Sequence, residues 1–356
     1  MKKIALMGSE DFIEPFKREG FEVLWVYPLA YSMLYEKGNK VFLNEGGFKE
    51  KLDFLKSEIF KFNPDYFLAN QWFFIKQLLN LADAKAGAIA GLYIDFLSEL
   101  HKKGIVTIIT CEDDTAVFGV KPIRSVTTNF NIVATYTLQN KKKYERCGQA
   151  VIYLPYYVTI DLPTKHVSEL PSDFFIPKLD VFFIGTMGFD RRMFLKRLSR
   201  KISDLNYFFG SKTIFYTSLK ETSFDWDDRN LVKEFYKKTS VNVIYGLGGD
   251  KFFNKCWGVS NRVFNVAYCR SFFIIDYRKH LEDIFDIDLK LYCFRNLNEC
   301  CKLIRFYLKN PSFRDELSDK FYNIVKERFT ITPSIKQLIY NIEAATMKNS
   351  WRSVGN

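Results

Sequence analysis

The sequence predicts an α/β protein built from two doubly wound domains. Short apolar segments alternate with amphipathic segments from the N-terminus to about residue 154, the alternation stops over 161–178, and it then restarts. Such alternation gives parallel strands joined by crossover helices. A length of 356 residues also suits two domains better than one.

The first half contains six predicted strands with helices between them. The strands are apolar, as expected where helices cover both faces of a sheet. We assign these strands to 3–7, 21–27, 66–69, 105–110, 131–136 and 151–154. The helices are assigned to 10–18, 48–62, 72–84, 88–102 and 139–147. The clearest is 48–62, where Leu52, Leu55 and Ile59 recur at helical spacing.

Residues 161–178 contain three prolines and no clear period, which is typical of a linker between domains. The strands expected beyond it are 181–184, 207–209, 241–245, 272–275 and 289–294. The helices expected there are 190–202, 231–238, 261–269, 297–309, 311–328 and 333–347. The predicted organisation is therefore an N-terminal domain (1–160), a linker (161–178), a C-terminal domain (179–332) and a final helix and tail (333–356).

The composition limits the classes of partner and compartment. A net charge of +11 favours anionic partners such as nucleotides, nucleic acid or an anionic membrane surface. The basic residues are scattered, and no RNA-binding signature or zinc-finger spacing occurs, so no nucleic acid is expected as a partner. Peripheral contact with a membrane stays open. Aromatic residues make up 17% of the chain, and most of them are expected to fill the cores.

Cysteine and histidine usage predicts a cytoplasmic protein without a metal centre. The seven cysteines are irregularly spaced and form no C-x-x-C pair, which is typical of reduced thiols. Only three histidines are present. The first apolar run ends at Met7, too early for a signal peptide, and no apolar stretch approaches the roughly 20 residues of a membrane span.

Two segments of the second half have the pattern of a phosphate or nucleotide site. The strand before Gly185 leads through a short loop into a helix with Arg191 in its first turn, where backbone N–H groups and a guanidinium could face a diphosphate. Ser260 can cap a helix that carries Arg262 and Asn265, and the side chain at 265 could hydrogen-bond a ribose. The alternatives are an ordinary βα turn and a capped helix with solvent-facing polar residues.

Two further loops are weaker candidates. The glycine-rich run 246–249 follows a strand, but it matches neither a phosphate-binding P-loop nor a dinucleotide-binding fingerprint. Asp113 and Asp114 follow the strand 105–110 at the edge where ligands bind in doubly wound sheets. They could provide a general base or bind a metal, or they could cap the next element in solvent.

The second half resembles the CgeB-like (spore maturation protein) branch of the GT-B glycosyltransferases over about 160–340. The likeness rests on five loose motifs in the same order. They are Asp180-Val-Phe-Phe-Ile-Gly-Thr with Arg191 six residues after Gly185, Phe208-Phe-Gly-Ser, Tyr236 to Asn242, Asn261-Arg-Val-Phe, and Phe306-Tyr-Leu-Lys-Asn-Pro with Arg314.

The resemblance implies two Rossmann-like domains that face a cleft, with no required metal or other cofactor. A nucleotide-sugar would bind the C-terminal domain, with Gly185, Thr186 and Arg191 facing the phosphates. Gly210 and Ser211 would lie near the base, and Arg262 and Asn265 near the ribose or phosphates. The N-terminal domain would supply the acceptor side and the catalytic base, for which Asp113 and Asp114 are the candidates. The final helix could return onto the first domain.

Asn265 is a departure from the family pattern, in which this position is usually a glutamate that holds the ribose hydroxyls. An amide lacks the negative charge, so the hydrogen bond would be weaker by on the order of 1 kcal/mol. The expected function is transfer of a sugar from a nucleotide-sugar to an unidentified acceptor. The alternative is a catalytically inactive GT-B-like binding or assembly protein of a cell-surface or spore layer.

Overall fold

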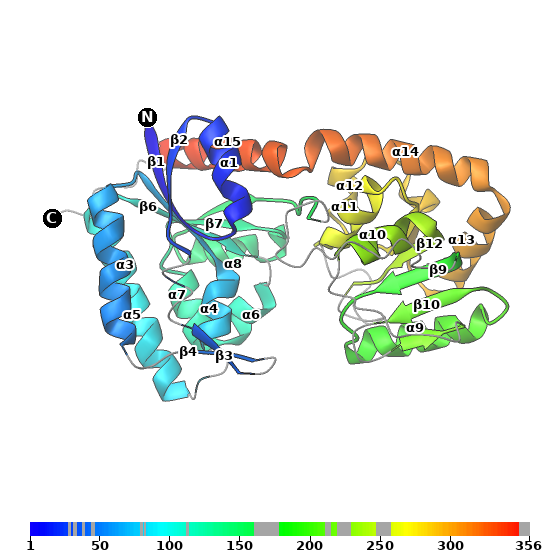
Figure 1. Cartoon of the computed structure of the whole chain (residues 1–356), viewed down its shortest axis with the longest axis horizontal. Helices are drawn as coiled ribbons and strands as arrows, with labels where there is room; N and C mark the ends of the chain where they lie inside the picture. The colour runs from blue at the N-terminus through cyan, green and yellow to red at the C-terminus, as the bar shows by residue number, and fades with distance from the viewer. Residues whose placement is uncertain are drawn as a thin grey trace. The chain divides into compact units, whose positions relative to one another are not determined.

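The computed structural model of the chain forms two compact units (Figure 1). Unit 1 comprises Met1–Pro155 together with Ile331–Asn356, and unit 2 comprises Tyr156–Thr330. The structure describes residues 1–27, 30, 34–37, 40–43, 47–78, 81, 83–111, 114–159, 178–210, 215–218, 229–246 and 258–348. The expected linker, 161–178, lies outside these residues apart from Lys178.

Unit 1 is built on a six-stranded parallel sheet with the order β2-β1-β5-β6-β7-β8. Its strands are β1 (Lys2–Met7), β2 (Phe21–Trp25), β5 (Tyr66–Asn70), β6 (Val106–Cys111), β7 (Ile132–Thr135) and β8 (Ala150–Tyr153). A separate antiparallel hairpin consists of β3 (Leu34–Lys37) and β4 (Lys40–Leu43). The strand order reverses at β1, which gives the sheet its doubly wound topology.

Helices cover both faces of this sheet. The helices are α1 (Ile13–Arg18), α3 (Phe48–Phe62), α4 (Gln71–Leu78), α5 (Asp83–Lys102), α6 (Asp114–Gly119), α7 (Lys121–Thr127), α8 (Lys141–Arg146) and α15 (Ile331–Lys348), with the 3-10 turns η1 (Glu10–Phe12) and η2 (Leu138–Asn140). Buried side chains of α3, α4, α5 and α7 form one core with the sheet. Helices α1 and α15 pack together on the other side, where α15 contacts β7 and β8.

Unit 2 has a second six-stranded sheet, with the order β11-β10-β9-β12-β13-β14. Its strands are β9 (Leu179–Ile184), β10 (Tyr207–Gly210), β11 (Phe215–Thr217), β12 (Thr239–Ile244), β13 (Phe273–Asp276) and β14 (Cys293–Phe294). All neighbours pair in parallel except β10 and β11. The reversal of strand order lies at β9, between β10 and β12.

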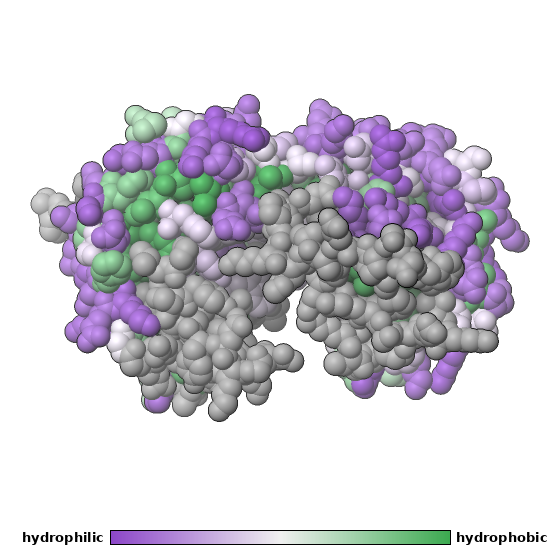
Figure 2. All heavy atoms as spheres, viewed as in Figure 1, coloured by the Kyte–Doolittle hydropathy of each residue, from purple (hydrophilic) through white to green (hydrophobic). Residues whose placement is uncertain are grey.

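The helices of unit 2 form two layers. They are α9 (Phe189–Lys201), α10 (Arg229–Lys238), α11 (Asn261–Tyr268), α12 (Leu281–Ile284), α13 (Leu297–Lys309) and α14 (Pro311–Arg328), with the 3-10 turn η4 (Leu289–Leu291). Helices α9 and α13 contact each other, and α10 and α11 do the same, while α14 packs on α11. Hydrophilic residues prevail over α14 in Figure 2, as expected for a helix with only one buried face. None of the described helices is long and apolar enough to cross a bilayer.

Aromatic rings fill much of the core of unit 2. Phe182 stacks on Phe235 with ring centroids 5.3 Å apart. Phe194 of α9 stacks on Tyr245, just beyond β12, at 4.0 Å. The second stack fixes the inner face of α9 against the carboxyl end of β12, because offset or parallel ring contacts are more directional than aliphatic packing.

The expected fold class is confirmed, since both units are doubly wound α/β sheets. One expected strand is wrong in extent. Residues 289–294 were expected to form the last strand, but η4 occupies Leu289–Leu291 and β14 is only Cys293–Phe294. Asp288 caps the turn by accepting a hydrogen bond from the backbone N–H of Lys290 at 2.9 Å. Strand β11 and the β3–β4 hairpin were not anticipated.

Leu338 tests whether α15 is an integral part of unit 1. The residue is fully buried on a helix that contacts β7 and β8. We expect Leu338→Ala to lower the free energy of unfolding by about 2–5 kcal/mol, because it leaves a cavity in the core. Urea unfolding of the full chain measures the change. Tyr340→Ala, at a position 68% exposed, is the matched control and should cost less than about 0.5 kcal/mol. Equal costs for the two variants would contradict the packing of α15.

Candidate functional site

Four parallel strands of unit 2 end side by side and bring their following residues together. The register pairs Ile184 of β9 with Gly210 of β10, and Ile244 of β12 with Ile275 of β13. The residues after these positions therefore gather at one edge of the sheet. This carboxyl edge, next to the reversal of strand order at β9, is where doubly wound sheets bind ligands.

Arg191 points toward this edge because of its place on α9. The buried residues of the helix include Arg191, Phe194 and Leu198, which recur at three- and four-residue steps. Arg191 is the member of this inner face nearest the N-terminus of the helix, and it is only 3% exposed. Its Nη1 donates a hydrogen bond to the carbonyl oxygen of Thr186.

Arg262 reaches the same place from α11. Ser260 caps this helix by accepting a hydrogen bond from the backbone N–H of Arg262 at 3.4 Å. The guanidinium carbons of Arg191 and Arg262 each lie 5.4 Å from the centre of the Phe183 ring. The ring, near the carboxyl end of β9, thus contacts two cations by cation–π interactions.

Gly185 leaves the space that Arg262 occupies. A Cβ atom at this position would lie 2.6 Å from Cζ of Arg262, and the residue has a φ of +152°, which side chains rarely adopt. The backbone N–H of Gly185 donates to the carbonyl oxygen of Gly210 at 2.9 Å. The absence of a side chain at Gly185 therefore leaves room for the Arg262 guanidinium. The N–H group of Gly185 adds one more hydrogen bond between β9 and β10 beyond the end of β9.

A third guanidinium and one carboxylate complete the group. Arg278 and Asp276 form an ion pair with side chains 7% and 2% exposed. Asp276 also accepts a hydrogen bond from the backbone N–H of Gly246 at 2.9 Å. A Cβ atom on Gly246 would lie 2.5 Å from Cζ of Arg278, so this glycine also permits the close approach of a guanidinium. Gly246 belongs to the glycine-rich run predicted as a candidate loop, whereas Asp276 and Arg278 were not among the predicted site residues.

We call Arg191, Arg262, Arg278 and Asp276 the arginine cluster. Its three guanidiniums and one carboxylate leave an excess of positive charge in a buried place. Burial and the neighbouring Arg262 lower the pKa of Arg191 to about 9, and burial also lowers the pKa of Arg262. Among the described residues, Nε of Arg191 and Nη1 of Arg262 are buried and have no hydrogen-bond acceptor. An anion with several oxygens would satisfy both the charge and the free donors.

The structure brings together four of the predicted donor-site residues. Gly185, Thr186, Arg191 and Arg262 surround Phe183, although the side chain of Thr186 is exposed and only its carbonyl oxygen takes part. Gly210 adjoins this group through its hydrogen bond with Gly185. Ser211 lies outside the described residues.

The side chain of Asn265 forms hydrogen bonds with Thr159. Its Oδ1 accepts a hydrogen bond from the backbone N–H of Thr159 at 2.8 Å, and its Nδ2 donates to Oγ1 of Thr159 at 3.0 Å. Arg229 donates to the carbonyl oxygen of Thr159 at 2.9 Å. In this structure Asn265 therefore holds Thr159, near the start of unit 2, against α11.

The two candidate catalytic carboxylates cannot be placed. Asp113 lies outside the described residues, and Asp114 begins α6 but its side chain is not described. The part of the chain that is described contains no group of three His, Cys, Asp or Glu side chains arranged to hold a metal ion.

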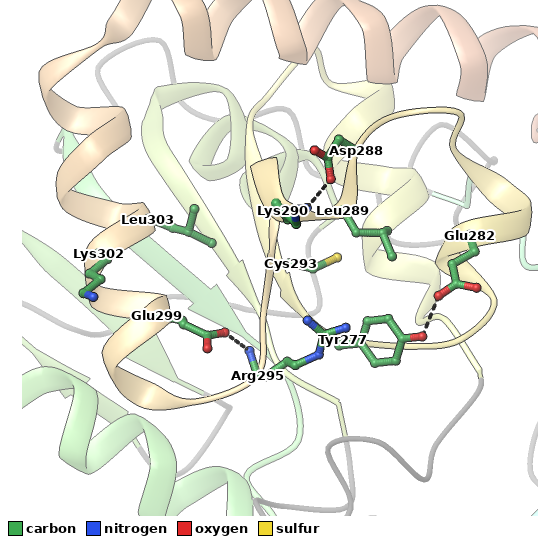
Figure 3. A pocket seen from close by; sticks show the side chains of 10 residues that line it. All are labelled: Tyr277, Glu282, Asp288, Leu289, Lys290, Cys293, Arg295, Glu299, Lys302 and Leu303. Atoms are coloured by element: carbon green, nitrogen blue, oxygen red, sulfur yellow. Dashed lines mark hydrogen bonds between the residues drawn. The ribbon is translucent and has the colours of Figure 1, made fainter.

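A separate cavity of about 600 Å³ lies at the edge of the unit 2 sheet beside β14 (Figure 3). Arg295 lies over the ring of Tyr277 at 4.6 Å, and the Tyr277 hydroxyl donates to Glu282 at 2.6 Å. Glu299 caps the start of α13 through the backbone N–H of Arg295. Burial raises the pKa of the Cys293 thiol, so this cysteine is not poised as a nucleophile.

Comparison with known proteins identifies the architecture. Residues 191–339 match a family model described as "Glycosyl transferase-like". Among solved structures, the chain is similar to sucrose-phosphate synthase from Thermosynechococcus elongatus, with a TM-score of 0.52, 12% identity, and coverage of 97% of this chain and 100% of that one. It is also similar to Anabaena HepE in complex with UDP, with a TM-score of 0.51, 9% identity, and coverage of 97% and 100%.

The fold is that of the GT-B glycosyltransferases. T4 phage β-glucosyltransferase has it as well, with a TM-score of 0.50, 12% identity, and coverage of 97% of this chain and 99% of that one. The matched family segment begins at Arg191 and includes the whole arginine cluster. No curated protein matches the chain in sequence. The expectation of a glycosyltransferase therefore agrees with both the family segment and the fold, while the CgeB-like branch stays a prediction.

Gly185 provides a test of the geometry around Arg262. We expect Gly185→Ala to lower the free energy of unfolding by about 1–3 kcal/mol, because the new methyl group displaces a buried guanidinium. Gly148→Ala is the matched control: its φ is also positive, at +84°, but no atom lies within 4 Å of the new Cβ.

A double-mutant cycle separates the contact from backbone strain. In an Arg262→Ala background, Gly185→Ala should cost about 1 kcal/mol less than in the parent chain. Urea unfolding measures all four proteins. An identical cost in both backgrounds would show that Arg262 does not occupy the space beside Gly185.

Asn265 provides a second test. We expect Asn265→Ala to destabilise the protein by about 1–3 kcal/mol, because it leaves the backbone N–H of Thr159 without its acceptor. Thr159→Val removes only the hydroxyl and should cost less. Thermal unfolding of both variants measures the difference. If Asn265→Ala leaves stability unchanged but weakens nucleotide binding, the ribose role expected from the sequence is correct instead.

Proposed function

We propose that this protein is a glycosyltransferase whose unit 2 binds the diphosphate of a nucleotide-sugar at the arginine cluster. The observation that carries the proposal is the pair of buried guanidiniums on Phe183 with free donors at Arg191 Nε and Arg262 Nη1. A diphosphate carries the negative charge and the several acceptor oxygens that this cluster lacks. The family segment and the fold support the same class of enzyme.

The chemistry follows from the placement of charge. When the bond between the anomeric carbon and the diphosphate breaks, negative charge grows on the leaving oxygen. Guanidiniums that are already buried and fixed stabilise that charge without reorganising, which lowers the barrier. Because Arg191 and Arg262 supply this charge, we propose that transfer continues in the presence of EDTA.

Two parts of the proposal come from the sequence, and a third comes from a structural neighbour. Unit 1 provides the acceptor side, with Asp113 or Asp114 as the base that accepts the proton of the acceptor hydroxyl. The five motifs of the second half support a CgeB-like branch for the enzyme. Uridine is the first nucleotide to test, because HepE, which shares the fold, was solved in complex with UDP.

Arg191 is the residue on which to test donor binding. We expect Arg191→Ala to weaken UDP binding by about 100-fold, because a buried, charge-assisted contact to phosphate is worth about 3 kcal/mol. Isothermal titration calorimetry of the full chain measures the affinity. Arg200→Ala removes an equal charge from the exposed end of the same helix and should change the affinity less than threefold.

Two results would contradict the proposal. If the parent protein binds neither UDP nor UDP-glucose, the arginine cluster is not a nucleotide site. If UDP binds but no UDP is released from UDP-glucose, with or without added acceptors, the protein is the inactive GT-B-like binding protein that is the alternative.

A further inference from the structure

The outer side of α9 carries an unusual combination of side chains. Five residues form one exposed row along the helix, and we call this row the α9 outer stripe: Phe189, Met193, Lys196, Arg197 and Arg200. These positions recur at three- and four-residue steps, opposite the inner face that holds Arg191. The helix therefore has an apolar and basic side where a soluble α/β domain normally has a mixed-charge one.

The first turn of the stripe is apolar and exposed. Phe189 is 70% exposed and Met193, one turn further, is 36% exposed. The other large exposed apolar side chains among the described residues lie at Met1 and on α3, α4, α13 and α15. Phe306 of α13, for example, contacts the rings of Tyr307 and Phe313. Phe189 and Met193 lie one turn apart on the same helix face, so together they form a continuous exposed apolar area.

The rest of the stripe is basic, and α9 itself contains few acids. Over its 13 residues α9 has six arginines and lysines and a single acid, Asp190. Among the described residues, no carboxylate pairs with Lys196, Arg200 or Lys201. The neighbouring helix α13 adds Lys302 and Lys309, and its Arg305 is the one that pairs, with Asp204 at 2.8 Å.

We propose that the α9 outer stripe binds the surface of an anionic lipid bilayer. Lys196 and Arg200 would meet lipid phosphates, and Phe189 and Met193 would enter the boundary between headgroups and acyl chains. A nucleic acid would use the same charges, but an exposed methionine beside the phenylalanine adds little to its binding. The apolar pair therefore favours lipid.

The placement of the stripe bears on the acceptor, and this step rests on the proposed function. Arg191 of the donor site and the α9 outer stripe lie on opposite faces of one helix, about 10 Å across. A bilayer at the stripe would hold the donor diphosphate close to the membrane surface. The acceptor class that fits is a hydroxyl or amine carried by a membrane lipid.

Vesicle sedimentation tests the surface. The full chain is mixed with vesicles of phosphatidylcholine alone or of phosphatidylcholine with phosphatidylglycerol. We expect binding only with phosphatidylglycerol, and weaker binding at high salt. Lys196→Gln together with Arg200→Gln should lower the partition coefficient by about 30-fold, and Phe189→Ser should lower it by about tenfold.

Matched controls separate this surface from overall charge. Lys142→Gln together with Arg146→Gln removes two exposed charges at the same spacing from α8, and Phe54→Ser removes an exposed ring from α3. These controls should bind as the parent does. Melting temperatures of all variants check that each one folds.

Several outcomes would overturn the proposal. They are the absence of binding to phosphatidylglycerol vesicles, equal losses in the α8 and α9 variants, or binding of single-stranded DNA through the α9 outer stripe without vesicle binding. UDP calorimetry on the same proteins keeps the two proposals apart. A protein that binds vesicles but not UDP would retain the membrane surface and refute the donor site.

Discussion

The burial of two guanidiniums against one aromatic ring is the constraint on which the site of unit 2 depends. Arg191 and Arg262 repel each other and lose hydration. Among the described residues, the carboxylate beside them is Asp276, which already pairs with Arg278. Such an arrangement is costly in the absence of an anion and becomes favourable once an anion is bound. The stack of Phe194 on Tyr245 keeps α9 in place, so the charges stay aligned before a ligand arrives.

Much of the fold could be predicted from the sequence, because its signals are local. Alternating apolar and amphipathic segments indicate strands and helices, and parallel strands leave few topologies. The error at 289–294 has an equally local cause. The apolar residues of η4 look like a strand, yet Asp288 stabilises a 3-10 turn through the N–H of Lys290. The cap from Asp288 therefore favours a 3-10 turn at Leu289–Leu291, although both leucines are apolar.

The site was predicted only in part, because some of its contacts join distant residues. Helical periodicity already places Arg191 on the inner face of α9. Arg278 and Asp276 are two residues apart, but the nearness of both to Gly246 depends on the pairing of β12 with β13. Asn265 is the clearest case: its partner, Thr159, is 106 residues away in the chain. No local pattern in the sequence indicates that contact.

Helix α9 links the chemistry of the donor site to the surface of the domain. Its inner face must be apolar around Arg191 to keep that guanidinium buried. This requirement fixes which positions of the helix face outward, but it does not fix which residue types occupy them. A short helix under no further constraint would place mixed charges there, since those add solubility. Instead the outward residues are two exposed apolar side chains and a row of basic ones. Because burial at the donor site does not explain these outward residues, a separate contact at the outer face does, and an anionic lipid surface satisfies both their charge and their apolar area.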